Sequence, residues 1–207
     1  MSAKKIQSAL SDLSIFYDKN LPEMTINIYL FASPKESSGI GGGAILKEKG
    51  ITLEIRNLKD IRDYLLIILH EIAHSFLEKN SVEKVEKIVK KYKFPSNNLI
   101  KERGKTNLIS ELILSSFVPN GYLIEKYFNI PIRKMTKKYI QITQKKLFFA
   151  KKWSFLEKYI VFHLYPLAKK YIENKKKLDE NYIKIAIETT IQAIKFRFET
   201  HIFSAII

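Results

Sequence analysis

Two histidines and a glutamate lie at a spacing that suits metal chemistry. In His70-Glu71-Ile72-Ala73-His74 the histidines are four residues apart, so on an α-helix both imidazoles project from one face toward a common point. Glu71 lies about 100° further round such a helix and can reach a water held there. A zinc ion would lower the pKa of that water, and Glu71 would remove its proton as general base. The pattern predicts His70 and His74 as metal ligands and Glu71 as the catalytic residue.

The residues around this motif favour a metal site over a structural role. Residues 65–69 are all apolar, and Phe76 and Leu77 follow the motif, so we expect a buried helix over residues 60–79 with Asp60 as its N-cap. Three ionisable groups are costly to bury there unless a partner compensates them, and a metal ion would compensate all three. The alternative is a pair of structural histidines hydrogen-bonded to neighbours, with Glu71 at the surface.

Residues 67–76 resemble the extended signature of the zincin metallopeptidases, with uncharged residues at 72, 73 and 75 and a hydrophobic residue at 76. The expected order of helix, strand, hairpin and metal-binding helix is also similar to theirs, and the resemblance covers about residues 1–125. It implies a zinc-dependent peptidase acting on a peptide or protein substrate. In that fold an edge strand beside the cleft pairs with an extended substrate, and Gly43–Lys47 or Ile51–Arg56 would take that part here.

A catalytic zinc site has three protein ligands, so a third must join the histidines. Asn80 stands where the third histidine of the metzincins would fall, which leaves a carboxylate. We favour Glu111, the only charged residue in the apolar stretch 107–119, because a buried carboxylate requires a partner. This stretch loosely resembles the second metal-binding helix of the ImmA/IrrE-type gluzincins, but its Glu-to-Pro distance is shorter and their Glu-Ala-Asn trio is missing. The competing carboxylates are Glu78, Glu83, Glu86 and Glu102.

A hydrolase of this kind also needs a group that stabilises the negative charge developing on the substrate carbonyl. The candidates are two tyrosines and the two remaining histidines: Tyr122, His163, Tyr165 and His201. The sequence does not choose among them, and core packing is the more common role for each tyrosine.

The composition restricts the chemistry and the surroundings of the protein. The 207 residues include no cysteine, so a metal site must use His, Asp or Glu. The start of the chain lacks the features of a signal peptide, and the most apolar stretch, Tyr64–Leu77, is too short to span a bilayer. We therefore expect a cytoplasmic protein with no membrane span.

The charge is concentrated in the C-terminal part of the chain. The net charge is +15, of which residues 1–130 contribute +4 (19 basic minus 15 acidic) and residues 131–207 contribute +11 (17 minus 6). Such a region can attract nucleic acid or an acidic partner, although a lysine-rich face is also typical of a solvated surface. The alternative function is therefore a basic helical binding protein with a non-catalytic HExxH.

The hydrophobic pattern predicts an α+β fold, with a small antiparallel or mixed sheet and the HExxH helix followed by a helical C-terminal region. Helices are expected at 2–18, 60–79, 81–93, 107–117, 132–150, 152–177 and 180–204, and strands at 24–31, 44–47 and 51–56. Gly50 should supply a positive φ in the hairpin turn, Pro166 should kink or interrupt its helix, and Asp179 should cap the last one. We divide the chain into a zincin-like catalytic lobe (1–130) and a basic helical C-terminal lobe (131–207).

Overall fold

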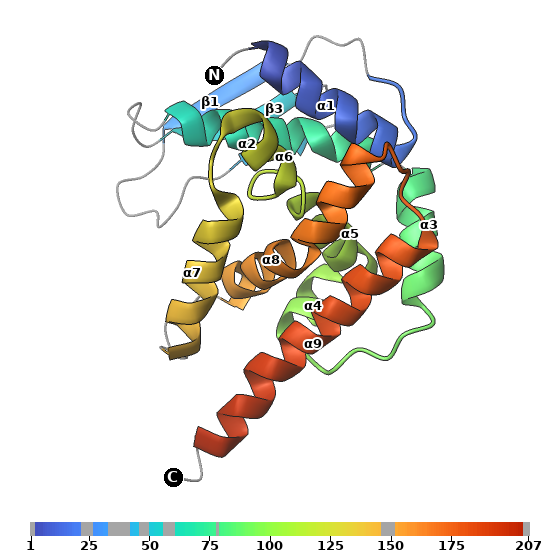
Figure 1. Ribbon diagram of the computed structural model, residues 1–207, viewed down its shortest axis with the longest axis vertical. Helices are drawn as coiled ribbons and strands as arrows, with labels where there is room; N and C mark the ends of the chain where they lie inside the picture. Colours follow the sequence, from blue (N-terminus) through green and yellow to red (C-terminus); the bar gives the residue numbers. More distant parts are fainter. Residues whose placement is uncertain are drawn as a thin grey trace.

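Helices build most of the protein, and a small sheet lies at one end beside the first two helices (Figure 1). The computed structural model describes residues 3–21, 27–32, 42–45, 50–55, 61–77, 79–145 and 152–204. In chain order the elements are α1 (Ala3–Tyr17), β1 (Asn27–Ala32), β2 (Gly42–Ile45), β3 (Gly50–Ile55), α2 (Ile61–Ala73), the 3-10 helix η3 (His74–Phe76), α3 (Lys79–Val89), α4 (Asn98–Arg103), α5 (Lys105–Ser115), α6 (Tyr122–Phe128), α7 (Ile132–Lys145), α8 (Lys152–Glu173) and α9 (Glu180–Ser204).

The described strands form a sheet in the order β1-β3-β2. β2 and β3 are antiparallel, with Ala44 opposite Ile51, which confirms the pairing of the predicted hairpin. β1 runs parallel to β3, with Ile28 opposite Ile51. The sheet is therefore mixed, which confirms one of the two predicted alternatives, whereas a purely antiparallel sheet is wrong, and the α+β class broadly fits. β3 has a neighbouring strand on both sides, so the prediction that Ile51–Arg56 could be an edge strand is wrong. Of the two segments considered for that part, only the one that contains β2 lies at an edge of the described sheet.

Gly50 lies inside β3 rather than in the turn, where it pairs with Asn27 and Ile45. The expected positive φ at this residue is therefore wrong. A Cβ atom at Gly50 would lie 2.9 Å from Cε2 of Tyr29 on the neighbouring strand, so the glycine leaves room for that ring. The turn residues 46–49 are outside the described part of the chain.

The metal-motif helix packs between the sheet and the rest of the protein. α2 contacts β2, β3 and α1, and it buries Leu69 and Ala73, with Phe76 following in η3. These residues recur at helical spacing, which is why one side of α2 enters the core. α2 ends at Ala73, and α3 starts at Lys79, so the helix expected over 60–79 is shorter; Asp60 and Glu78 lie outside the described residues.

Two short helices were not predicted. α4 begins in a stretch expected to be a polar loop, where Oδ1 of Asn97 accepts a hydrogen bond from the Leu99 amide at 2.8 Å and so caps the helix. Gly104, with φ of 75°, ends α4 and starts α5. α6 follows the turn of residues 116–121.

The helices of the C-terminal region follow the prediction closely. α8 continues from Lys152 to Glu173 through Pro166, so the proline does not interrupt the helix. The alternative expectation, a kink at Pro166, stays a prediction. Leu164, Tyr165 and Ala168 beside the proline are buried, and this packing favours the continuous helix. The predicted cap of α9 is confirmed, since Oδ1 of Asp179 accepts a hydrogen bond from the Tyr182 amide at 2.9 Å.

One hydrophobic cluster extends across the predicted lobe boundary. It joins Phe16 of α1 and Phe117 after α5 to Tyr171 and Tyr182 of α8 and α9. The ring of Phe16 lies 4.5 Å from that of Phe117 and 5.1 Å from that of Tyr182. The division at residue 130 stays a prediction, but the core continues across it. Among the described helices, none is long and apolar enough to cross a membrane.

Candidate metal centre

The end of α2 brings the two motif histidines together. His70 lies in the last turn of α2, and His74 begins η3. Their Nε2 atoms are 3.2 Å apart. Two nitrogens bound to one tetrahedral zinc ion at 2.0–2.1 Å would be separated by roughly 3.3–3.4 Å. The pair therefore already has a spacing that suits a shared metal ion.

A backbone oxygen fixes the orientation of the His70 ring. Nδ1 of His70 lies 3.1 Å from the carbonyl oxygen of Val118, and because a carbonyl can only accept, Nδ1 carries the proton. Nε2 then keeps its lone pair and faces His74. Burial, followed by the nearby His74, lowers the pKa of His70 to about 4, so the ring is neutral near pH 7 and able to bind a metal ion.

The turn that carries Val118 is held by two close contacts. The hydroxyl groups of Ser116 and Tyr182 lie 2.8 Å apart in the core, which ties the turn to α9. At the other end of the turn, Gly121 packs directly on Ser116, where a Cβ atom would lie 2.1 Å from the Ser116 carbonyl oxygen. The turn thus requires glycine at position 121, and its position determines where the Val118 oxygen meets His70.

Glu71 lies beside the two histidines and is almost enclosed. Its side chain has a relative exposure of 8%, and one carboxylate oxygen and the ligand nitrogens of His70 and His74 all lie within 4.8 Å of one another. The surface position that a structural interpretation required for Glu71 is therefore wrong. The three groups could hold a metal ion or place a carboxylate next to one.

Glu111 of α5 reaches the same place from a different helix. Its carboxylate oxygens lie 3.4 Å from Nδ1 of His74 and 3.8 Å from Nε2 of His70. Burial raises the pKa of Glu111 above its usual value, and the opposing effects of His74 and Arg103 are smaller. A cation would stabilise the charged form of this carboxylate. The approach of Glu111 to Nε2 of His70 fits a third ligand, whereas its closer contact is to Nδ1 of His74, the nitrogen that would not bind the shared ion. The ligand role of Glu111 stays a prediction.

The other described carboxylates considered as third ligand lie on helix surfaces. Glu83 and Glu86 lie on α3, where Glu86 forms an ion pair with Lys90 at 2.6 Å, and Glu102 is exposed on α4. They are surface residues of their helices. Glu78 is outside the described residues.

Several charged groups around Glu111 were not found from the sequence. The guanidinium of Arg103 lies over the ring of Trp153, 4.2 Å from its centroid, and its charge lowers the pKa of Glu111, whereas Glu157 raises it. Nδ2 of Asn120 donates a hydrogen bond to Glu157 at 3.0 Å. Trp153 and Glu157 are four residues apart on α8. This helical spacing predicts that they share a face, but nothing in the sequence relates that face to Glu111.

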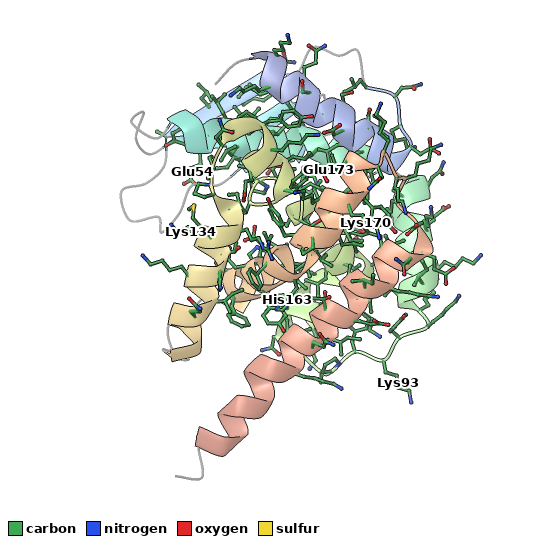
Figure 2. The ribbon with its side chains drawn as sticks, in the orientation of Figure 1. Glu54, Lys93, Lys134, His163, Lys170 and Glu173 are labelled. Carbon is green, nitrogen blue, oxygen red and sulfur yellow. The ribbon has the colours of Figure 1, made fainter. Side chains whose placement is uncertain are left out.

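The three described candidates for stabilising the substrate carbonyl contact other groups. The hydroxyl of Tyr122 donates to Glu173 at 3.0 Å. Tyr165 bonds Glu125, and burial together with this bond raises its pKa to about 12. Figure 2 places Glu173 well away from His163 along α8. His163 is exposed and lies against the ring of Tyr159 at 4.2 Å. His201 lies in α9, but its side chain is outside the described part.

Comparison with models of known protein families, with curated proteins and with solved structures found no match to this chain. The metal motif and the geometry around it are therefore the basis for an assignment of function.

Proposed function

We propose that this protein is a zinc-dependent hydrolase that cleaves peptide bonds. The observation that carries the proposal is the 3.2 Å separation of the two Nε2 atoms beside two carboxylates, Glu71 and Glu111, from different helices. Two histidines that only pack in a core would not need two carboxylates close to them. The arrangement offers three ligands and one base, which is what a catalytic zinc site needs.

The donor set fits zinc better than other common divalent ions. Two imidazoles and one carboxylate form the ligand set of His₂Glu zinc hydrolases. Magnesium and calcium prefer oxygen ligands, and the chain has no cysteine for a thiolate site. His70 needs no deprotonation near pH 7, which favours metal binding at that pH.

The residues divide the work as follows. His70, His74 and Glu111 would hold the ion, which supplies a Lewis acid for the substrate carbonyl and makes a water more acidic. Glu71 would accept a proton from this water and later deliver it to the leaving nitrogen of the peptide. Its enclosure by neighbouring side chains strengthens its interaction with charges in the site.

An extended peptide is the substrate we favour. β2 is an edge strand of the described sheet and contacts α2. The free side of an edge strand can bind an extended chain through backbone hydrogen bonds, independently of the side chains of that chain. β2 would therefore guide a peptide past the end of α2.

The experiment that tests the proposal combines metal content with cleavage. Protein purified without chelator, and after dialysis against zinc, is analysed for metal per chain, and its digestion of a peptide mixture is followed by mass spectrometry. We expect about one zinc per chain, lost in His74→Ala. Glu71→Gln should keep the metal but lose at least about 100-fold in cleavage rate, whereas Glu102→Gln on exposed α4 should match the wild type. A wild-type protein that binds no metal after zinc dialysis would contradict the proposal.

A second candidate function rests on the basic surface of α7. Arg133, Lys134, Lys137 and Lys138 are all exposed on this helix, and α7 has no acidic residue. Such a surface could bind nucleic acid or another acidic partner. Salt-dependent retention on single-stranded DNA, reduced in Lys134→Glu/Lys137→Glu, would support it. Retention of this variant equal to the wild type would contradict it.

A further inference from the structure

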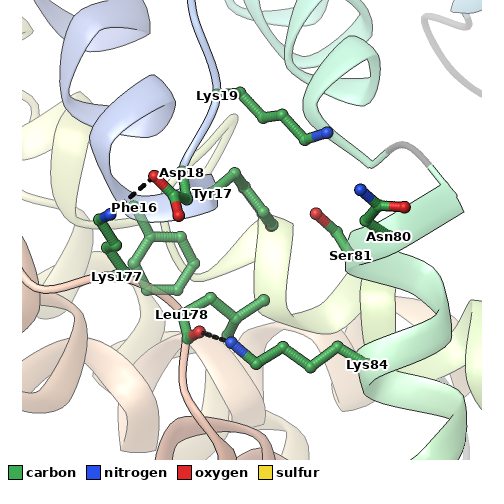
Figure 3. A pocket seen from close by; sticks show the side chains of 9 residues that line it. All are labelled: Phe16, Tyr17, Asp18, Lys19, Asn80, Ser81, Lys84, Lys177 and Leu178. Carbon is green, nitrogen blue, oxygen red and sulfur yellow. Dashed lines mark hydrogen bonds and ion pairs between the residues drawn. The ribbon is translucent and has the colours of Figure 1, made fainter.

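A cavity of about 220 Å³ lies where the ends of three helices meet (Figure 3), and neither motif histidine lines it. It is bounded by the end of α1, the first two turns of α3 and the connection between α8 and α9. The lining residues are Phe16, Tyr17, Asp18, Lys19, Asn80, Ser81, Lys84, Lys177 and Leu178. Its volume is far above the roughly 10–15 Å³ that a single water needs, so it can hold a small molecule or a substituent of one.

The lining of the cavity is strongly cationic. Its lining includes three lysines from three separate segments and a single carboxylate, that of Asp18. Lys177 pairs with Asp18 at 2.8 Å, and Lys84 donates to the carbonyl oxygen of Leu178. An ammonium group has three N–H donors, so each of these two lysines keeps donors for another acceptor. The formal charges of the lining side chains, three lysines and one aspartate, sum to +2.

Backbone hydrogen bonds fix the segments that carry these side chains. The Lys19 amide donates to Ser14 at 2.8 Å and closes the end of α1. The Leu178 amide donates to the Phe16 carbonyl at 2.6 Å and joins the α8–α9 connection to α1. The side chain of Ser81, in the first turn of α3, is 7% exposed and adds a hydroxyl donor. The cavity wall is thus formed before a ligand binds, which lowers the entropic cost of binding.

We propose that this cavity binds a phosphate-class oxyanion, either free phosphate or the phosphate group of a small phosphomonoester. Lysine ammonium groups and a hydroxyl are typical donors to phosphate oxygens. A cation would meet three ammonium groups and one carboxylate, and an apolar ligand would offer these ammonium groups no acceptor. The chemistry of the lining therefore selects a compact anion with several acceptor oxygens.

The site is separate from the candidate metal centre and does not depend on the proposed hydrolase function. None of its lining residues is His70, Glu71, His74 or Glu111. Tyr17 lines the cavity, and its ring stacks on that of Phe76, two residues after His74, with the ring centroids 6.3 Å apart. A test can therefore use the metal-free protein.

The test is a titration of metal-free protein with inorganic phosphate at constant ionic strength, followed by calorimetry. We expect saturable binding with one phosphate per chain. Lys19→Gln/Lys84→Gln should raise the dissociation constant at least about tenfold, because charge-assisted hydrogen bonds are lost. The matched control Lys93→Gln/Lys170→Gln removes the same charge from exposed positions seen in Figure 2 and should change it less than about twofold. Methyl phosphate in place of phosphate distinguishes the two sources, since a phosphomonoester site binds it at least as tightly.

Two further results would decide the matter if the double variant folds poorly. Ser81→Ala removes one uncharged donor and should weaken phosphate binding by about threefold or more, with the thermal unfolding midpoint checked for each variant. Absence of saturable binding to the wild type would overturn the proposal. Equal losses in the cavity variant and in the control would also overturn it, since binding would then follow total charge alone.

Discussion

The carbonyl oxygen of Val118 determines which nitrogen of His70 faces His74. Because it accepts a hydrogen bond from the protonated Nδ1, the Nε2 lone pair is available toward the neighbouring imidazole. The same burial that gives the ring this partner lowers its pKa to about 4. His70 is consequently neutral over the pH range in which most proteins work, and a metal ion does not compete with a proton there.

This pKa makes a prediction about acid stability. In the unfolded chain His70 should have a pKa near 6.5, against about 4 in the folded protein, so the unfolded state binds the proton more readily. Its stabilising effect is present above pH 6.5 and is lost as the pH falls toward 4, by on the order of 3 kcal/mol. Denaturant unfolding of the metal-free protein, compared with His70→Asn, measures it. An equal pH dependence of the two proteins would contradict the prediction.

Glu111 provides a second prediction, since its oxygens approach both histidines. Glu111→Gln keeps the shape of the side chain but removes its charge, and we expect zinc affinity to fall by about 10–100-fold. Competition with a coloured chelator measures the affinity, and Glu102→Gln serves as control. If Glu111 only pairs with His74 and does not bind the ion, zinc affinity should change by less than about threefold.

At the scale of elements, the turn between α5 and α6 leaves no room for a side chain at position 121. A Cβ atom at Gly121 would overlap the Ser116 carbonyl group, so Gly121→Ala must displace the turn and the Val118 oxygen with it. We expect a loss of about 2 kcal/mol or more in the free energy of unfolding, together with weaker zinc binding. Gly104→Ala is the control, because its positive φ is strained by alanine while no atom lies within 4 Å. It should cost about 1 kcal/mol and leave zinc binding unchanged.

The sequence predicted the features that depend on the spacing of residues within one helix, such as the proximity of His70, Glu71 and His74. The positions of the two histidines follow from four residues of helix, and Glu111 was conspicuous as a lone charge in an apolar helix. The Val118 oxygen could not be predicted, because every residue carries a carbonyl and only tertiary packing selects one. The same reason applies to the parallel pairing of β1 with β3, which joins strands that are separated by β2 in the chain.

Helix ends and interruptions were the least predictable features. Pro166 lies inside α8 without ending it, because buried neighbours on that helix outweigh the local preference of proline. α4 was missed since it is only one to two turns long and none of its residues is buried. Its prediction would have required recognising Asn97 as an N-cap.

At the scale of the whole molecule, metal binding should stabilise the fold. The proposed ligands come from α2, η3 and α5, so the unfolded chain does not present them together. Zinc at about 100 times its dissociation constant would add roughly 2.7 kcal/mol to the free energy of unfolding. Thermal unfolding with zinc and with chelator measures this difference, which should vanish in His74→Ala. A wild-type midpoint unaffected by zinc would contradict the proposed site.

The bond between Ser116 and Tyr182 has a consequence for how the protein is made. Tyr182 belongs to the last helix and supports the turn that orients His70. A ribosome releases the motif helix long before it releases Tyr182. The nascent chain should therefore carry an unfinished centre, which gains its final geometry only when α9 docks. Under the proposed hydrolase function, the centre would stay inactive until α9 has been synthesised and has docked, and this delay would protect the growing chain and its surroundings from premature hydrolysis.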